Sequence, residues 1–166
     1  MEGTCFDEDW AAVAASVSVL RRVMGRLHQA GSEHLGPMFG DLDEIERLVG
    51  ALKVGVLDQG LSRRDVRASD AASPAGWVRQ WGHSYAAGGA AALVRVTEAV
   101  AQPCNGLLAE AVMAARAPVT NAAVALTELD KLRPRLTPEC HGAVLAGFVA
   151  LAEGQGPHQI RALRRR

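Results

Sequence analysis

DAASPAGWVRQWGHSYAAGGAAALVRVTEAV, residues 70–100, is the stretch that decides the predicted fold. Ser73 is a favourable N-cap, and Pro74 suits the first helical position, where an absent N–H costs no hydrogen bond. A Gly-His-Ser turn follows, and its Ser84 can cap a second helix that runs to the end of the stretch. A short helix, a tight turn and a longer helix predict a helix-turn-helix-like unit near residues 73–100.

Several pieces of sequence in and around this stretch match the pattern of a known helical family. They are RAS at 67–69, SPAGWVR at 73–79, LVRV at 93–96, LLAEA at 107–111, PVTNA at 118–122 and QIRALRRR at 159–166. Together they resemble the domain-of-unknown-function 222 family, also called the 13E12 repeat family. Domains of this family typically form the N-terminal part of actinobacterial HNH endonucleases. The resemblance covers residues 45–166.

The resemblance implies a DNA-recognition or targeting domain that does not itself cut DNA. An HNH site needs closely placed His and Asn residues that hold a metal ion and activate water, and this chain supplies no such set. A longer parent protein could be an HNH endonuclease, because the last predicted helix still runs at Arg166. Family members usually carry several arginines after the turn, whereas here the first basic residue of that helix is Arg95.

Composition favours an all-α fold. Half of the 166 residues are apolar, few are aromatic, and alanine, the best helix former, dominates. No run alternates β-branched and polar residues as a strand would. The length fits one domain with a real core. We therefore predict a single helical domain over residues 1–166 with seven or eight helices, in which two long helices within 1–60 support a family-like core at 61–166.

Charge is unevenly distributed, although the formal net charge is zero. Residues 1–60 carry 10 acidic and 5 basic side chains, and residues 61–166 carry 8 acidic and 13 basic ones. The C-terminal part is therefore the half that could meet the phosphates of DNA. The three cysteines are far apart and form no CxxC pair, so we predict no metal and no cofactor.

Location follows from the absence of export and membrane signals. The N-terminus is acidic, which is the wrong charge for a signal peptide, and no apolar run approaches the roughly 20 residues of a membrane span. The sequence predicts a cytoplasmic protein that does not enter a membrane.

Two long apolar stripes precede the decisive stretch. The first predicted helix runs from Asp7 to Gln29, a Gly-rich loop spans 31–40, and Asp41 caps a second helix that ends near Gly60. The stripes repeat at three-and-four spacing and consist of Trp10, Val13, Val17, Leu20, Met24 and Leu27, then Leu42, Ile45, Val49, Leu52 and Val56. The helices could pair antiparallel, or residues 42–56 could form a homodimer, since a heptad stripe serves either purpose.

Candidate DNA-binding residues are the arginines that lie next to the helix-turn-helix-like unit. They are Arg63, Arg64, Arg67, Arg79 and Arg95. On one interpretation they form a phosphate-binding surface. On the other they are solvated arginines whose stems cover apolar surface.

A second candidate site is the aromatic group around the turn, made by Trp77, Trp81, His83 and Tyr85. It could stack on a base or a flat ligand, or the tryptophans could belong to the core. If they bind a ligand, the rival function is a helical scaffold for a small molecule or a protein partner.

Two further patterns deserve a prediction. Gly88 and Gly89 lie inside a helix and should cost about 2 kcal/mol relative to alanine, so we expect a neighbouring helix or a DNA backbone to approach them closely. Cys140 and His141 are adjacent, but neighbouring helical residues point in different directions. No catalytic residue is predicted.

Overall fold

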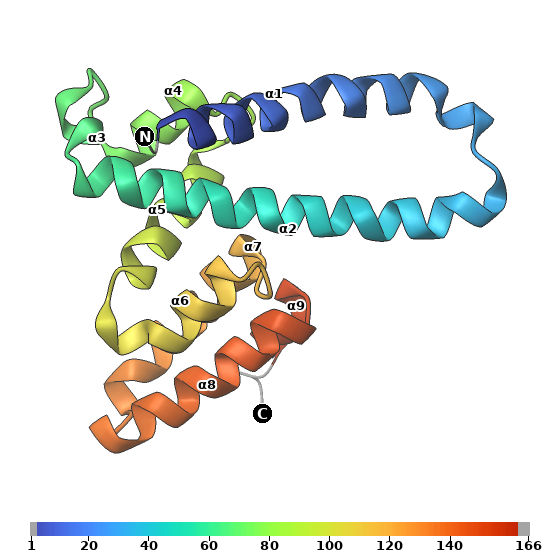
Figure 1. Cartoon of the computed structure of the whole chain (residues 1–166). Coiled ribbons are helices and arrows are strands. Elements are labelled where there is room, and N and C mark those ends of the chain that lie inside the picture. Colours follow the sequence, from blue (N-terminus) through green and yellow to red (C-terminus); the bar gives the residue numbers. More distant parts are fainter. Residues whose placement is uncertain (1–2, 163–166) are drawn as a thin grey trace. The chain divides into compact units, whose positions relative to one another are not determined.

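The computed structural model describes residues 3–162, and within them the protein is entirely helical (Figure 1). No strand occurs among these residues, which confirms the predicted all-α class. The α-helices are α1 Gly3–Arg26, α2 Ser32–Ser62, α3 Asp65–Ala68, α4 Pro74–Trp81, α5 Ala87–Val100, α6 Gly106–Met113, α7 Val119–Leu132, α8 Pro138–Gly154 and α9 Pro157–Ala162. Three 3-10 helices accompany them: η1 Leu27–Gln29, η2 Pro103–Asn105 and η3 Arg133–Arg135.

The chain divides into two compact units, and each is described separately. Unit 1 is Met1–Leu42 and unit 2 is Asp43–Arg166. The boundary falls inside α2, so this one continuous helix contributes its first part to unit 1 and the remainder to unit 2.

Unit 1 corrects one prediction. The Gly-rich segment 31–40 is not a loop, because α2 already begins at Ser32 and includes Pro37. Pro37 is the sixth residue of α2, beyond the first four N–H groups that lack partners within a helix, so it leaves the Glu33 carbonyl without its usual donor. The helix continues through this position in spite of that cost. Glu33 in the first turn interacts favourably with the helix dipole.

Unit 1 buries none of its described side chains. The predicted stripe of α1 lies on one helix face, yet all its members are exposed, from Trp10 to Leu27. Leu35, Phe39 and Leu42 of α2 are exposed as well.

Unit 2 contains the buried core. Its largest fully buried side chains come from five helices and are Val54, Leu57, Val96, Thr97, Leu108, Val112, Leu129 and Ile160. Helix α7 packs against α5, α8 and α9, and α6 packs beside α8 (Figure 1). Many other core residues are alanines, whose small side chains let helices approach closely. Each fully buried leucine contributes about 1.5–3 kcal/mol.

A buried amide connects two helices of this core. Helix α7 begins at Val119, directly after Pro118, so neither Thr120 nor Asn121 caps it. Asn121 is instead buried, and its Nδ2 donates to the carbonyls of Ala152 at 3.1 Å and Gln155 at 2.9 Å. These carbonyls lie at the C-terminal end of α8, where helical carbonyls lack partners within the helix. Asn121 therefore satisfies the end of a neighbouring helix.

Candidate nucleic-acid interface

The helix-turn-helix-like unit consists of α4 and α5, which pack against each other. Ser73 caps α4 as predicted, and its hydroxyl accepts a hydrogen bond from the Gly76 amide at 3.1 Å. The predicted cap of the second helix is wrong, because α5 begins at Ala87. The Tyr85 amide donates to the Gly82 carbonyl at 2.9 Å, so Ser84 is held inside a turn rather than at the helix start.

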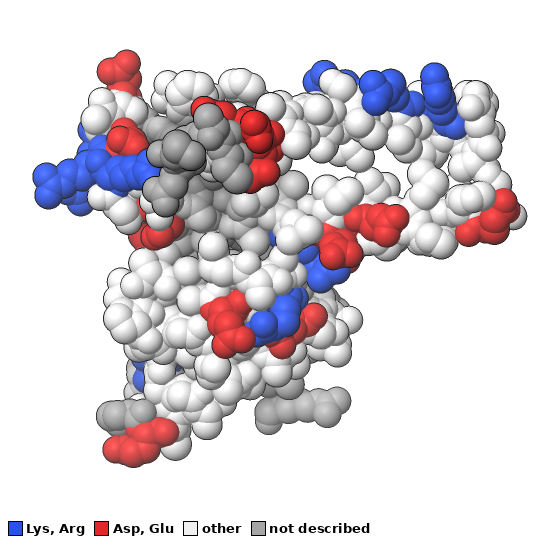
Figure 2. Space-filling model, in the orientation of Figure 1, with Lys and Arg blue, Asp and Glu red and all other residues white. Residues whose placement is uncertain are grey.

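Three of the five candidate arginines lie together where α2 passes into α3. Arg63 and Arg64 form the turn between the helices, and Arg67 lies on α3. All three side chains are exposed, and none forms an ion pair with a described residue. We call residues 63–67 the arginine turn. Figure 2 shows basic side chains gathered at this end of unit 2, with acidic side chains beside them.

A buried side chain attaches the arginine turn to the core of unit 2. Val66 is buried in the core, and a Cβ added at Gly60 would lie only 3.2 Å from its Cγ2. The missing side chain at Gly60 thus lets α3 fold back closely onto the end of α2. The reversal requires a left-handed residue, and Arg64 adopts it with φ 68°. A non-glycine residue pays about 1–2 kcal/mol in this conformation, so the surrounding packing holds the turn in place.

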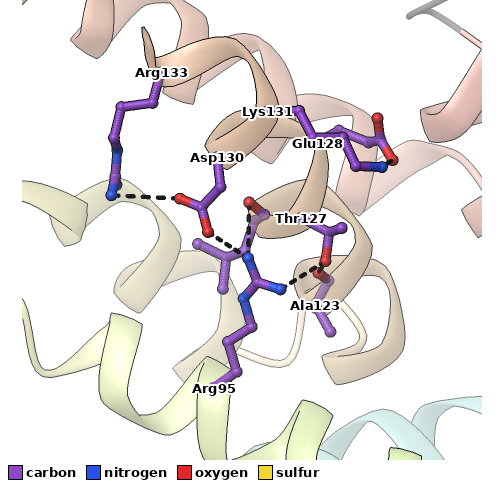
Figure 3. Close-up of polar contacts among 8 residues, drawn as sticks. Arg95, Ala123, Thr127, Glu128, Asp130, Lys131 and Arg133 are labelled. Atoms are coloured by element: carbon purple, nitrogen blue, oxygen red, sulfur yellow. Dashed lines mark hydrogen bonds and ion pairs between the residues drawn. The ribbon is translucent and has the colours of Figure 1, made fainter.

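Arg79 and Arg95 differ sharply in their surroundings. Arg79 is exposed on α4, and its Nε lies 3.4 Å from the Ala75 carbonyl of the same helix. Arg95 is half-buried and reaches from α5 to α7, where it donates to Thr127 Oγ1 at 2.9 Å and pairs with Asp130 (Figure 3).

The surroundings of Arg95 indicate a structural role. Asp130 compensates its charge, and the Leu126 carbonyl accepts a further hydrogen bond at 3.4 Å. Asp130 also pairs with Arg133, at 3.3 Å (Figure 3). The structure therefore separates Arg95, which links α5 to α7, from the arginine turn.

Arg116 is another arginine with a structural role, and no local sequence pattern predicts that role. Its guanidinium donates to Glu153 at 2.8 Å and to Glu110 at 3.1 Å, and so links the segment after α6 to α8. The hydrogen bond to Glu153, and then that to Glu110, raises the pKa of Arg116 further above its ordinary value.

The predicted aromatic group divides into two parts. Trp77 and Tyr85 are half-buried and pack against the core of unit 2. Trp81, the last residue of α4, is 70% exposed, and His83 is also exposed. Lys53 Nζ lies 5.1 Å from the centre of the Tyr85 ring, within reach of a cation–π contact. Within this predicted group, Trp81 is therefore the residue that offers a large free aromatic surface.

The glycine pair has a different explanation from the one we predicted. No atom lies within 4 Å of a Cβ added at Gly88, so no helix packs closely there. A Cβ at Gly89 would lie 3.4 Å from the Tyr85 ring, and one at Gly82 would lie 2.8 Å from it. Gly89 and Gly82 therefore border the space of an aromatic ring within the same unit.

A surface hollow of about 520 Å³ lies elsewhere on unit 2. Cys104, Arg133, Thr137 and His141 are among the residues that line it. The sequence suggested only the adjacent pair of Cys140 and His141, whereas the hollow brings His141 to the same site as the distant Cys104. Only tertiary packing places these two side chains together, so no local sequence pattern could have found them.

Other features of the described residues add no catalytic or membrane site. No three or more His, Cys, Asp or Glu side chains among them are grouped to hold a metal ion. None of the described helices combines the length and apolar character of a membrane span. No protein-family model, no curated protein and no solved structure matches the chain.

Proposed function

We propose that this chain is a helical DNA-binding or targeting domain, similar in role to the N-terminal part of HNH endonuclease-type proteins and not itself catalytic. The observation that carries the proposal is the arginine turn. Arg63, Arg64 and Arg67 are exposed within five residues, free of ion pairs with described residues, and next to the α4–α5 unit. Closely spaced guanidinium groups suit bidentate contacts with phosphate oxygens.

The binding mode follows from which side chains are available. The exposed start of α5 carries only alanine and glycine, from Ala87 to Gly89, so it offers no side-chain donor to base edges. Base edges are read by polar side chains in the grooves, and phosphate contacts carry no sequence information. We therefore propose binding to the DNA backbone that depends little on sequence, with Arg79 on α4 as a further contact.

The affinity should be low and sensitive to salt. Asp65 lies within the arginine turn and Asp70 follows it, and both carboxylates reduce its net positive charge. Each phosphate contact on duplex DNA contributes about −0.9 to the slope of log affinity against log salt. The three contacts of the arginine turn therefore give a slope of about −3, and the further contact of Arg79 brings it to about −4.

The experiment compares two double variants that each remove two exposed arginines. Arg63→Gln/Arg67→Gln alters the arginine turn, whereas Arg135→Gln/Arg161→Gln alters exposed arginines elsewhere in unit 2. Duplex binding is measured by fluorescence anisotropy across a salt series. The first variant should reduce the magnitude of the slope by about two, and the second should leave it unchanged. Failure of the wild-type chain to bind at low salt rejects the proposal.

A second candidate function is a scaffold that binds a small molecule or a protein partner through the region of Trp77, Trp81 and Tyr85. The exposure of Trp81 favours it, because a large free aromatic side chain is common at binding surfaces.

A fluorescence experiment distinguishes the scaffold from DNA binding at the same residue. Single-stranded DNA should quench Trp81 fluorescence if a base stacks on it. Trp81→Ala should abolish this quenching, whereas Trp10→Ala, a control at another exposed tryptophan, should preserve it. No response to either form of DNA would favour the scaffold.

A further inference from the structure

Helix α2 has two opposite apolar faces within unit 2. The inner face carries Ala51, Val54 and Leu57, which are buried in the core. The outer face carries side chains that are between 40% and 57% exposed, namely Ile45, Val49, Leu52 and Val56. Their spacing of four, three and four is that of the a and d positions of a coiled coil. Aligned apolar side chains of this kind mark an interaction surface.

We propose that this outer face pairs with the same face of a second copy of the chain, with the two α2 helices antiparallel. When Val49 and Val56 are a positions, Glu46 and Lys53 are the e positions, and both are exposed. Lys53 Nζ lies 5.1 Å from the centre of the Tyr85 ring, so it exchanges this contact for the carboxylate of the second copy. In an antiparallel pair the e positions of one helix face those of the other. Glu46 then meets Lys53 of the second copy, and Lys53 meets Glu46 of the second copy. Charges at these flanking positions set partner and orientation.

The apolar positions agree with the same alignment. When Val49 lies opposite Leu52 of the second copy, Ile45 lies opposite Val56, and every a position meets a d position. The contact is isologous, as in a two-fold symmetric dimer, because each copy contributes the same surface.

A parallel pair has the opposite charge pattern. There each e position faces a g position of the partner, and Glu46 would meet Asp41 of the second copy. Two carboxylates would then face each other on each side of the dimer. The charges on α2 therefore favour the antiparallel arrangement.

The test is sedimentation equilibrium of the full chain over a wide concentration range. The wild-type chain should form a dimer. Glu46→Lys and Lys53→Glu should each weaken it about tenfold or more, because two attractive contacts become repulsive. Mixing these two variants should restore dimerisation as a heterodimer, and the double variant should dimerise by itself. Glu44→Lys is the matched control, since it makes the same charge change off the outer face, and should have no effect.

A substitution in the apolar stripe and two results that would overturn the proposal complete the test. Leu52→Glu should abolish the dimer while circular dichroism shows that the helices remain. A wild-type monomer at every concentration overturns the proposal, and leaves a different protein as the partner of this face. A dimer that Glu46→Lys and Lys53→Glu leave unchanged also overturns it, because another surface must then form the contact.

Discussion

Units 1 and 2 carry similar apolar periodicity but differ in burial. In unit 1 the α1 stripe from Trp10 to Leu27 is exposed throughout, whereas in unit 2 Leu57, Leu108 and Leu129 are almost completely buried. Helix α2 contributes to both units and shows both conditions along its own length. The comparison teaches that periodicity predicts which face of a helix is apolar, while burial depends on several helices converging on that face.

The largest expected effect comes from removing apolar volume in each unit. Leu129→Ala should lower the free energy of unfolding by about 2–5 kcal/mol, because it leaves a cavity in the core. The same change at the exposed Leu35 should cost about 0.5 kcal/mol or less. Urea unfolding of both variants measures the difference. Equal losses of unfolding free energy in the two variants would show that the apolar side chains of unit 1 are buried in solution. The difference in burial between the units would then not hold.

A smaller effect is expected at the polar contact between α7 and α8. Asn121→Ala removes the donor for two carbonyls, so the free energy of unfolding should fall by about 1–3 kcal/mol. Thr120→Ala, one residue earlier and exposed, is the control and should change little. Thermal unfolding distinguishes them. If Asn121→Ala left the free energy of unfolding unchanged, the two hydrogen bonds of Asn121 would contribute nothing to the stability of unit 2.

Two glycine substitutions in the arginine turn should both weaken DNA binding but should change protein stability in opposite directions. Arg64→Gly relieves the left-handed strain at φ 68°, so stability should rise by up to about 1 kcal/mol while DNA binding weakens. Arg67→Gly removes the same charge from a helical residue, and should lower stability by about 1 kcal/mol. Denaturant unfolding and DNA titration of both variants test this. A loss of stability in Arg64→Gly would contradict the described turn.

The smallest effect concerns the start of α8. A hydrogen bond from its own backbone N–H, and then one from Thr137, lowers the pKa of Glu139 below its ordinary value. Such a carboxylate stabilises the fold above the ordinary pKa, and this contribution is lost as pH falls through the lowered pKa. Glu139→Gln should therefore reduce Tm slightly at neutral pH and leave it unchanged in acid. A difference that persists in acid would indicate another cause.

Local signals account for what the sequence predicted well. Ser73-Pro74 located the start of α4, because caps and prolines act on adjacent residues. Segment 31–40 was mispredicted as a loop, since its glycines and proline resemble loop residues, yet α2 runs through Pro37 from its start at Ser32.

Long-range contacts account for what the sequence could not predict. Arg95 contacts Asp130, and Asn121 contacts the end of α8, with 30 or more residues between the partners in sequence. Nothing local distinguishes Arg95 from the arginines of the turn, so all five arginines had to be treated alike. Tertiary packing alone shows that Arg95 has an acidic partner.

The central claim is that the arginine turn binds a polyanion. The most direct measurement is the salt dependence of duplex binding by the wild-type chain and by Arg63→Gln/Arg67→Gln, determined side by side. We predict a wild-type slope of about −4 and a variant slope about two units shallower. Identical slopes for the two proteins, or no wild-type binding at the lowest salt, would contradict the claim.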